Sequence, residues 1–243
     1  IMSTAAMEAS NYLINVEGAW LIETRDELLV PLAEEGFNHP VMDQIRAGTF
    51  PREKLIKLLS DLCWVITGFP EYVAALAARA PKNDHKVKAA LLENAFIERD
   101  HPFLLAHAIT KLGGNGEAIV NGPDWDHDAD DFMVSLRMVL EAYCYHRPWI
   151  EGMAALAVGI ETVTPRIFGG MGGAVIEHYG LTKEDTEWFD IHGGEVEMEH
   201  GNDGLRMLDS YVGVDDLQTQ KACVAGIKIV CRGIAIGLFD AYQ

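Results

Sequence analysis

Apolar side chains recur with a helical period along almost the whole chain, and no stretch alternates strictly enough to make a good strand. This periodicity predicts an all-α fold. Proline and glycine divide the pattern into helices joined by short loops, which is typical of one compact bundle spanning residues 1–243. The helices are expected at about residues 10–35, 40–48, 53–80, 84–112, 128–145, 149–179, 182–211 and 216–243.

The composition limits the kinds of partner that such a bundle can bind. The chain has 243 residues, of which 49% are hydrophobic, and a formal net charge of −18. That charge repels nucleic acid and anionic membranes, so we expect neither as a partner. None of the four cysteines forms a CxxC pair and no targeting segment is visible, so reduced thiols and a cytoplasmic location are expected.

The first candidate for chemistry is the tetrapeptide Glu98-Arg99-Asp100-His101. Residues three apart share a face of a helix, so Glu98 and His101 can reach one metal ion. The same Glu-x-x-His spacing recurs in helical di-iron proteins. Alone it is a weak signal, because an exposed polar face produces it equally well.

A second candidate is Glu161, which follows seven residues without a polar side chain, Ala154–Ile160. A carboxylate buried there is costly unless it is paired or coordinates a metal. Arg147 and Arg166 are the alternative partners. The sequence leaves both interpretations open.

A third segment, His192–His200, contains two histidines and three glutamates. Glu197 and His200 repeat the Glu-x-x-His spacing, but Glu197 points away from His192 on a regular helix. A π-bulge at Gly193-Gly194 would align His192, Glu197 and His200. Glu195 and Glu199 are the alternatives to Glu197.

Together these segments offer six ligands: Glu98, His101, Glu161, His192, Glu197 and His200. They combine carboxylate oxygens with imidazole nitrogens and include no thiolate. Such a set suits iron or manganese better than structural zinc. The sequence therefore predicts a metal centre inside a helical bundle.

The order of these pieces resembles the heme-oxygenase-like di-iron oxidases and oxygenases, relatives of TenA and PqqC. Asn38-His39-Pro40 and the run Gly48–Leu55 look like that family's opening motif, and Gly68-Phe69-Pro70 looks like its second helix. Glu98-x-x-His101 and Glu161 match its first ligands. His192, Glu197 and His200 resemble its HxxxDxxH motif, with one residue inserted and Glu in place of Asp.

The resemblance implies a seven-helix bundle, a homodimer, and two non-heme irons that react with dioxygen. One ion would be held by Glu98, His101 and Glu161, with His192, Glu197 and His200 completing the pair; the sequence does not divide the ligands further. The second iron can be labile. Family members cleave C–C bonds of fatty or amino acids or N-oxygenate amines, several of them in biosynthetic pathways.

Two cations supply a clue to the substrate. Lys228 and Arg232 lie four apart on one face of a very apolar helix. Such a pair can anchor a substrate carboxylate, so we expect a small amino-acid or fatty-acid derivative. A snorkelling exposed stripe is the alternative.

Three rival interpretations remain, one of which is a protein that binds a partner or holds metal without catalysing a reaction. A ferritin-like di-iron protein would use Glu71 with both Glu-x-x-His pairs and Glu161, leaving His192 without a role. A metal-free enzyme of the TenA or PqqC type would leave the acids and histidines unexplained, and a TenA-type enzyme needs a reactive cysteine.

Overall fold

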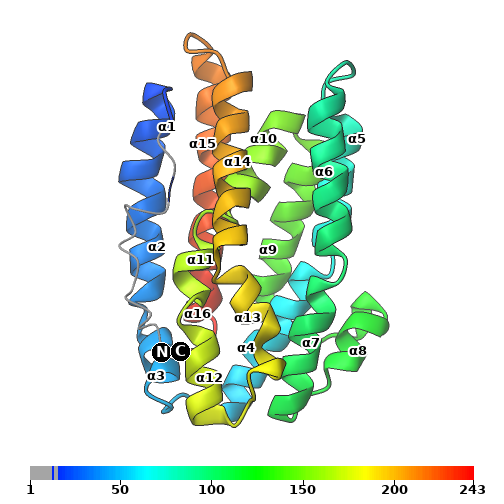
Figure 1. Cartoon of the computed structure of the whole chain (residues 1–243), viewed down its shortest axis with the longest axis vertical. Coiled ribbons are helices and arrows are strands. Elements are labelled where there is room, and N and C mark those ends of the chain that lie inside the picture. Colours follow the sequence, from blue (N-terminus) through cyan, green and yellow to red (C-terminus); the bar gives the residue numbers. More distant parts are fainter. Residues whose placement is uncertain (1–12, 14–15) are drawn as a thin grey trace.

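The computed structural model describes residue 13 and residues 16–243, apart from the side chains of Trp125, Glu195 and Val196. The described chain contains helices and no strand, as the periodicity predicts. Figure 1 shows the long helices running roughly parallel to the long axis of the molecule. The α-helices are α1 (Ala19–Thr24), α2 (Val30–Phe37), α3 (Pro40–Arg46), α4 (Arg52–Ile66), α5 (Phe69–Arg79), α6 (His85–Glu98), α7 (His101–Leu112), α8 (Gly116–Asn121), α9 (Asp131–Glu141), α10 (Trp149–Met153), α11 (Thr164–Phe168), α12 (Met171–Tyr179), α13 (Glu187–His192), α14 (Glu195–Tyr211), α15 (Leu217–Arg232) and α16 (Leu238–Asp240).

Short π- and 3-10-helical segments connect or extend these helices. The π-helical segments are Arg25–Leu29, Ala142–His146, Ala154–Val158 and Gly233–Gly237, and the 3-10 segments are Asp124–Asp126 and Glu184–Thr186. The predicted first helix begins late, at Ala19, and residues 10–12, 14 and 15 of that prediction lie outside the described chain. Helix α8 occupies a region that we expected to be a loop.

Four of the predicted long helices are broken: the one expected over 53–80 divides into α4 and α5, and the other three break at candidate ligands. The helix expected over 84–112 divides into α6 and α7, because Pro102 can occupy only the first turn of a helix. The helix expected over 149–179 opens into turns between Val158 and Thr164. The helix expected over 182–211 stops at Gly193-Gly194 and restarts as α14.

A small-residue contact fixes α14 against the centre of the bundle. A Cβ atom added to Gly201 would lie 3.0 Å from the backbone of Thr162, and one added to Gly204 would lie 3.0 Å from Ala157. The backbones can approach this closely because neither glycine carries a side chain. The contact brings the first turns of α14 beside the open segment that carries Glu161.

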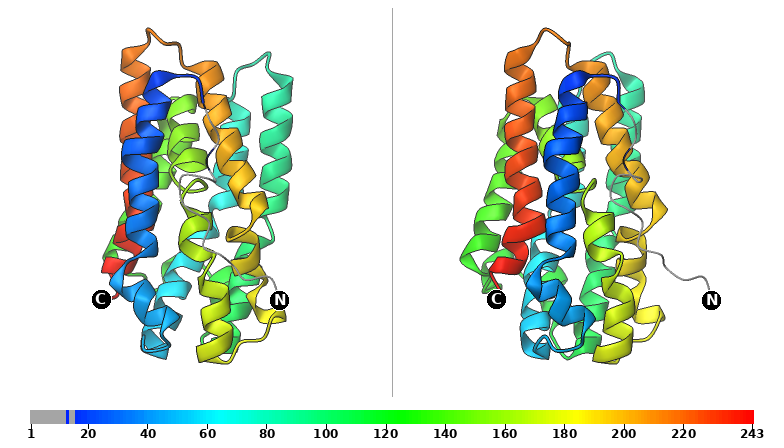
Figure 2. Two further views of the ribbon diagram at one scale, coloured as in Figure 1. Left: turned by 60° about the vertical axis from the view of Figure 1, so that its left-hand side comes forward. Right: turned by 90° about the vertical axis from the view of Figure 1, so that its left-hand side faces the viewer.

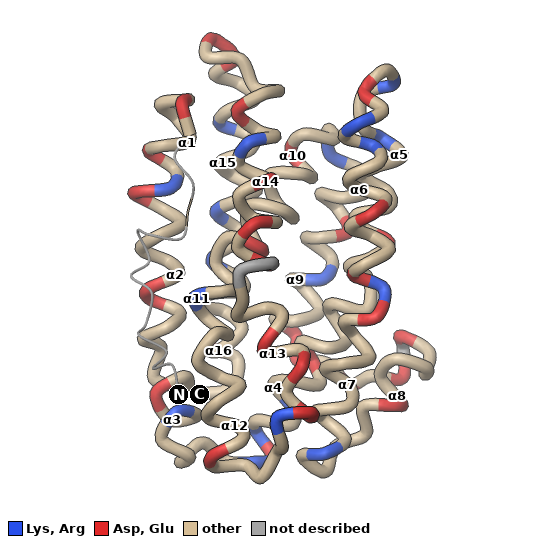
Figure 3. Tube along the Cα trace, viewed as in Figure 1, with Lys and Arg blue, Asp and Glu red and all other residues tan. Residues whose placement is uncertain are grey.

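Positions of both basic and acidic residues are distributed along the helices (Figure 3). In two further views, α2 runs beside the C-terminal helix α15 (Figure 2). Among the described residues one helix, Leu217–Asp240, is long and apolar enough to cross a membrane by length and composition alone. Its most apolar window is 61% buried inside the fold, as in a core helix.

Candidate metal centre

Glu98 and His101 face each other across the junction between α6 and α7. Glu98 is the last residue of α6 and His101 the first of α7, so they do not share one continuous helix as we expected. Both side chains are buried, and His101 Nδ1 lies 2.7 Å from Glu98 Oε2. The two atoms can form an ion pair, but His101 Nδ1 has no hydrogen-bond partner among the described residues. This arrangement is typical of two ligands that point at a common ion.

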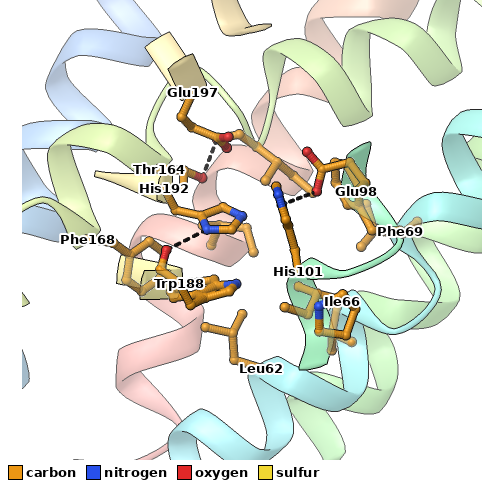
Figure 4. A pocket seen from close by; sticks show the side chains of 15 residues that line it. Leu62, Ile66, Phe69, Glu98, His101, Thr164, Phe168, Trp188, His192 and Glu197 are labelled. Atoms are coloured by element: carbon orange, nitrogen blue, oxygen red, sulfur yellow. Dashed lines mark hydrogen bonds and ion pairs between the residues drawn. The ribbon is translucent and has the colours of Figure 1, made fainter. Parts of the chain in front are cut away.

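His192, the last residue of α13, lies beside them (Figure 4). Its ring meets that of His101 edge to face, with 4.8 Å between the ring centroids. Its Nδ1 lies 2.7 Å from the carbonyl oxygen of Trp188 and can donate a hydrogen bond to it, which leaves Nε2 free to bind a metal. Burial lowers the pKa of His192 to about 4, so the ring is neutral at physiological pH. Ligand atoms of Glu98, His101 and His192 lie within 4.8 Å of one another.

Glu197 and His200 approach Glu98 from α14. Ligand atoms of Glu98, Glu197 and His200 also lie within 4.8 Å of one another, which makes a second group of three. His200 Nδ1 lies 3.8 Å from Glu197 Oε2 and 4.0 Å from Glu98 Oε1, and it too has no hydrogen-bond partner among the described residues. Glu98 therefore belongs to both groups. The structure places His192 with Glu98 and His101, whereas we expected Glu161 in that group.

Glu161 is buried and joins neither group of ligand atoms, although it lines a cleft together with His200 of the second group. Arg147 pairs instead with Glu151 and Arg166 with Glu34, so neither arginine neutralises it. Burial, and then the Glu98 carboxylate, raise the pKa of Glu161 well above its ordinary value. A cation beside these acids would relieve both effects.

The backbone aligns the third motif without the π-bulge that we expected. A turn at Gly193-Gly194 ends α13 at His192 and reorients the chain into α14. A Cβ added to Gly193 would lie 2.5 Å from Gly169 Cα, so only glycine fits there. Of the alternatives to Glu197, Glu199 is exposed and pairs with Arg206 at 2.6 Å, and the side chain of Glu195 lies outside the described residues.

The donor set fits a pair of metal ions. Glu197 is buried, and burial followed by Glu161 and Glu98 raises its pKa well above the ordinary value. Three buried carboxylates with no basic side chain other than histidine among their described partners are unfavourable without cations. Two imidazole nitrogens without hydrogen-bond partners, His101 Nδ1 and His200 Nδ1, each lie within 4.0 Å of a Glu98 oxygen. Oxygen and imidazole ligands suit iron or manganese.

An apolar cavity opens on the first group of ligands (Figure 4). Its lining includes Glu98, His101, His192 and Glu197, and contains no Lys or Arg among the described residues. The other lining residues are Leu62, Val65, Ile66, Phe69, Pro102, Leu140, Ile160, Thr164, Phe168, Trp188 and Ile234. Glu161 and His200 instead line a separate surface cleft with Glu93, Asn94 and Asp203.

The expected carboxylate anchor is not in this cavity. Lys228 and Arg232 are exposed and line a groove on the outer face of α15, beside Phe132 and Ile229 of the same groove. The prediction that they hold the substrate at the metal centre is therefore wrong. The alternative, an exposed stripe of two cations on the helix surface, agrees with the structure. An i, i+4 spacing fixes a common face but does not tell which face is buried.

The structure bears on the residues that the ferritin-like and the TenA-type interpretations need. Glu71 is exposed on α5 and joins neither group of metal-ligand atoms, contrary to a ferritin-like centre. Burial raises the pKa of each cysteine thiol to about 12, which disfavours the thiolate nucleophile of a TenA-type enzyme. A PqqC-type enzyme, which needs no such cysteine, stays an alternative.

Two cavity and cleft residues were missed by sequence reasoning. Trp188 lies four residues before His192 and packs on its ring, and Asn94 hydrogen-bonds Glu161. Each of them lies four residues before a candidate ligand, Trp188 before His192 and Asn94 before Glu98. This spacing places them on the same helix face as the ligand and could have identified them.

The fold is that of a heme-oxygenase-like helical bundle. It is similar to a TenA homologue from Pseudomonas syringae, with a TM-score of 0.77 and 18% identity over 98% of this chain and 96% of that one. A domain with a heme-oxygenase-like fold from Shewanella denitrificans gives 0.73 and 14% identity, covering 91% of each chain. A TenA homologue from Pyrococcus furiosus gives 0.70 and 16%, covering 92% of this chain and 98% of that one.

The sequence profile of a family described as iron-containing redox enzymes matches residues 59–232, well over half of the chain. The protein belongs to this family of iron-containing redox enzymes. The matched range includes all six candidate ligands. No curated protein matches the sequence with significance.

Proposed function

We propose that this protein is a non-heme di-iron enzyme that uses dioxygen to oxidise a small, largely apolar carboxylate, such as a fatty-acid or amino-acid derivative. The outcome would be C–C cleavage or N-oxygenation in a biosynthetic pathway. The observation that carries the proposal is the pair of ligand groups that share Glu98 beside an apolar cavity. A shared carboxylate is the common way for a helical protein to hold two irons.

Each ligand residue contributes something specific. Glu98, His101 and His192 would hold one ion, and Glu98, Glu161, Glu197 and His200 the other. Ferrous iron, when bound, supplies electrons for the reduction of dioxygen. The Trp188 carbonyl fixes the tautomer of His192, and the carboxylates neutralise the charge of the ions.

The cavity determines what can react there. Its apolar wall excludes water from the reacting centre and packs against an apolar part of the substrate. Because the described lining has no Lys or Arg, a substrate carboxylate would be held by the ions themselves and by neutral donors. A homodimer, a cytoplasmic location and the lack of nucleic-acid or membrane partners stay predictions.

The experiment is anaerobic loading with ferrous iron, followed by measurement of bound iron and of dioxygen uptake with a panel of straight-chain carboxylates and amino acids. We expect about two irons per chain and substrate-stimulated uptake. Protein loaded with zinc is the control and should consume no dioxygen. A parent that binds no iron, with His101→Ala and His200→Ala behaving like it, would instead favour a metal-free enzyme of the same fold.

A further inference from the structure

One buried hydrogen-bond donor near the metal centre has nothing to bind. Trp188 is 2% exposed, and its indole Nε1 has no hydrogen-bond partner among the described residues. Buried tryptophan N–H groups usually find an acceptor, and an unmet buried donor costs about 1–3 kcal/mol. Such a group calls for an explanation, and a ligand is one.

The indole is held in a fixed direction. It stacks on His192 with 4.2 Å between ring centroids and an interplanar angle of 23°, and it meets Phe168 edge to face at 5.3 Å. Phe189 packs against it at 90°. Trp188 lines the cavity, and Figure 4 shows the nitrogen end of its ring facing the open middle. The donor is therefore oriented before any ligand arrives.

The other donors of the described lining are already engaged. Thr164 Oγ1 donates to the carbonyl oxygen of Ile160 at 2.8 Å. His101 and His192 point ligand nitrogens at the first metal position. Trp188 is thus the one neutral hydrogen-bond donor without a partner that we find in the described lining. Its ring stacks directly on His192, a proposed metal ligand.

We propose that Trp188 determines specificity by donating its indole N–H to a carboxylate oxygen of the substrate, while the apolar tail packs against Leu62 and Phe168. This inference rests on the proposed function and names the residue that selects a carboxylate within it. A hydrogen bond to a charged acceptor is stronger than one between neutral groups. A fixed indole would also orient the carboxylate relative to the first metal position.

The test compares Trp188→Phe with Trp149→Phe in ferrous-loaded protein kept free of dioxygen. Trp149 is a matched control, because its buried Nε1 also lacks a partner but it does not line the cavity. Octanoate, decanoate and dodecanoate are the probes, measured by calorimetric titration. We expect Trp188→Phe to raise the dissociation constant about tenfold or more and Trp149→Phe to leave it unchanged.

A second readout does not depend on iron. In zinc-loaded protein the indole N–H resonance of Trp188, assigned by single Trp→Phe variants, should move downfield when decanoate is added. Equal affinities in Trp188→Phe and the parent, an unmoved resonance, or a parent that binds none of the three carboxylates would overturn the inference.

The two proposals fail separately. A parent that binds no iron, yet whose Trp188 resonance responds to decanoate, would reject the di-iron function and keep the role of Trp188. A parent with two irons and substrate-stimulated dioxygen uptake, whose Trp188→Phe variant binds carboxylates normally, would reject only the role of Trp188.

Discussion

The two groups of candidate metal ligands differ in both charge and surroundings. The first combines Glu98 with two imidazoles, from His101 and His192, and faces an apolar cavity. The second combines Glu98 with Glu197 and His200, and a further buried carboxylate, Glu161, lines a surface cleft together with His200. One position is therefore less anionic and enclosed, and the other is more anionic and nearer to solvent.

This difference suggests that the positions on either side of Glu98 would have different roles. In the proposed function, the enclosed position adjoins the cavity and would be the one that meets an apolar substrate. The anionic position has the stronger electrostatic attraction for a cation, but its cleft gives water and chelators a path to it. The following predictions test the comparison.

The largest effect is expected for Glu98→Ala, because this carboxylate belongs to both groups. Bound iron should fall from about two per chain to nearly none, and dioxygen uptake should fall with it. The measurement is iron content after anaerobic loading. Glu71→Ala, an exposed glutamate in the same bundle, is the control and should keep the parent content. A Glu98→Ala variant that retains one firmly bound iron would show that the groups do not share it.

Chelation should separate the two positions in time. A ferrous chelator added to loaded protein should remove one iron quickly, through the cleft beside His200, and the other at least about tenfold more slowly, because exchange at the enclosed position needs local opening. In Glu197→Ala the fast phase should disappear and the slow one remain. Release of both irons in one phase from the parent would contradict the difference in access.

A smaller effect is expected on the stability of the metal-free protein. Burial raises the pKa of Glu197 above its unfolded value, so the folded state binds more protons between these two values. The stabilising contribution of the protonated Glu197 carboxyl to the folded state is fully present at low pH and is lost as the pH rises. Glu197→Gln should therefore raise the melting temperature of the metal-free protein by a few degrees at pH 7.5 but not near pH 4.

Glu199→Gln is the control for this measurement. Glu199 lies on the same helix, but its hydrogen bond with Arg206 lowers its pKa, so removing its charge should give no gain in stability. A parent that is as stable as Glu197→Gln at neutral pH would mean that Glu197 has a partner cation even without added metal.

The smallest effect is expected at the outer groove. Lys228→Ala and Arg232→Ala should change iron content and dioxygen uptake less than about twofold, because both side chains are exposed outside the cavity. The measurement is substrate-dependent dioxygen uptake at saturating and limiting carboxylate. A rise in the Michaelis constant of tenfold or more would return these cations to the substrate site.

Much of the fold and the site was predictable from local pattern. Helical periodicity gave the bundle, and glutamates in apolar surroundings stood out because an unpaired buried charge is costly. Glu161 illustrates this, since the seven apolar residues before it already indicated burial. In the structure Glu161 is buried and lies close enough to Glu98 and Glu197 to influence them electrostatically. The role of these three residues as metal ligands stays a prediction.

The rest depended on packing between distant segments. We expected one continuous helix over 84–112, although Pro102 is typical of a helix start, and the way α6 and α7 meet at His101 is set by the bundle. Gly193-Gly194 announced a distortion, but only contact with Gly169 makes it a turn rather than a π-bulge. The predicted division of the ligands between two ions differs from the observed groups for the same reason. It depends on where α13 and α14 lie relative to α6.

The central claim is that two metal ions share Glu98, and anomalous diffraction at the iron edge from crystals loaded without dioxygen tests it most directly. The account predicts two iron peaks, both in contact with the Glu98 carboxylate. One should also contact His101 and His192, and the other Glu197 and His200. A single peak, or two peaks of which one does not contact Glu98, would contradict it.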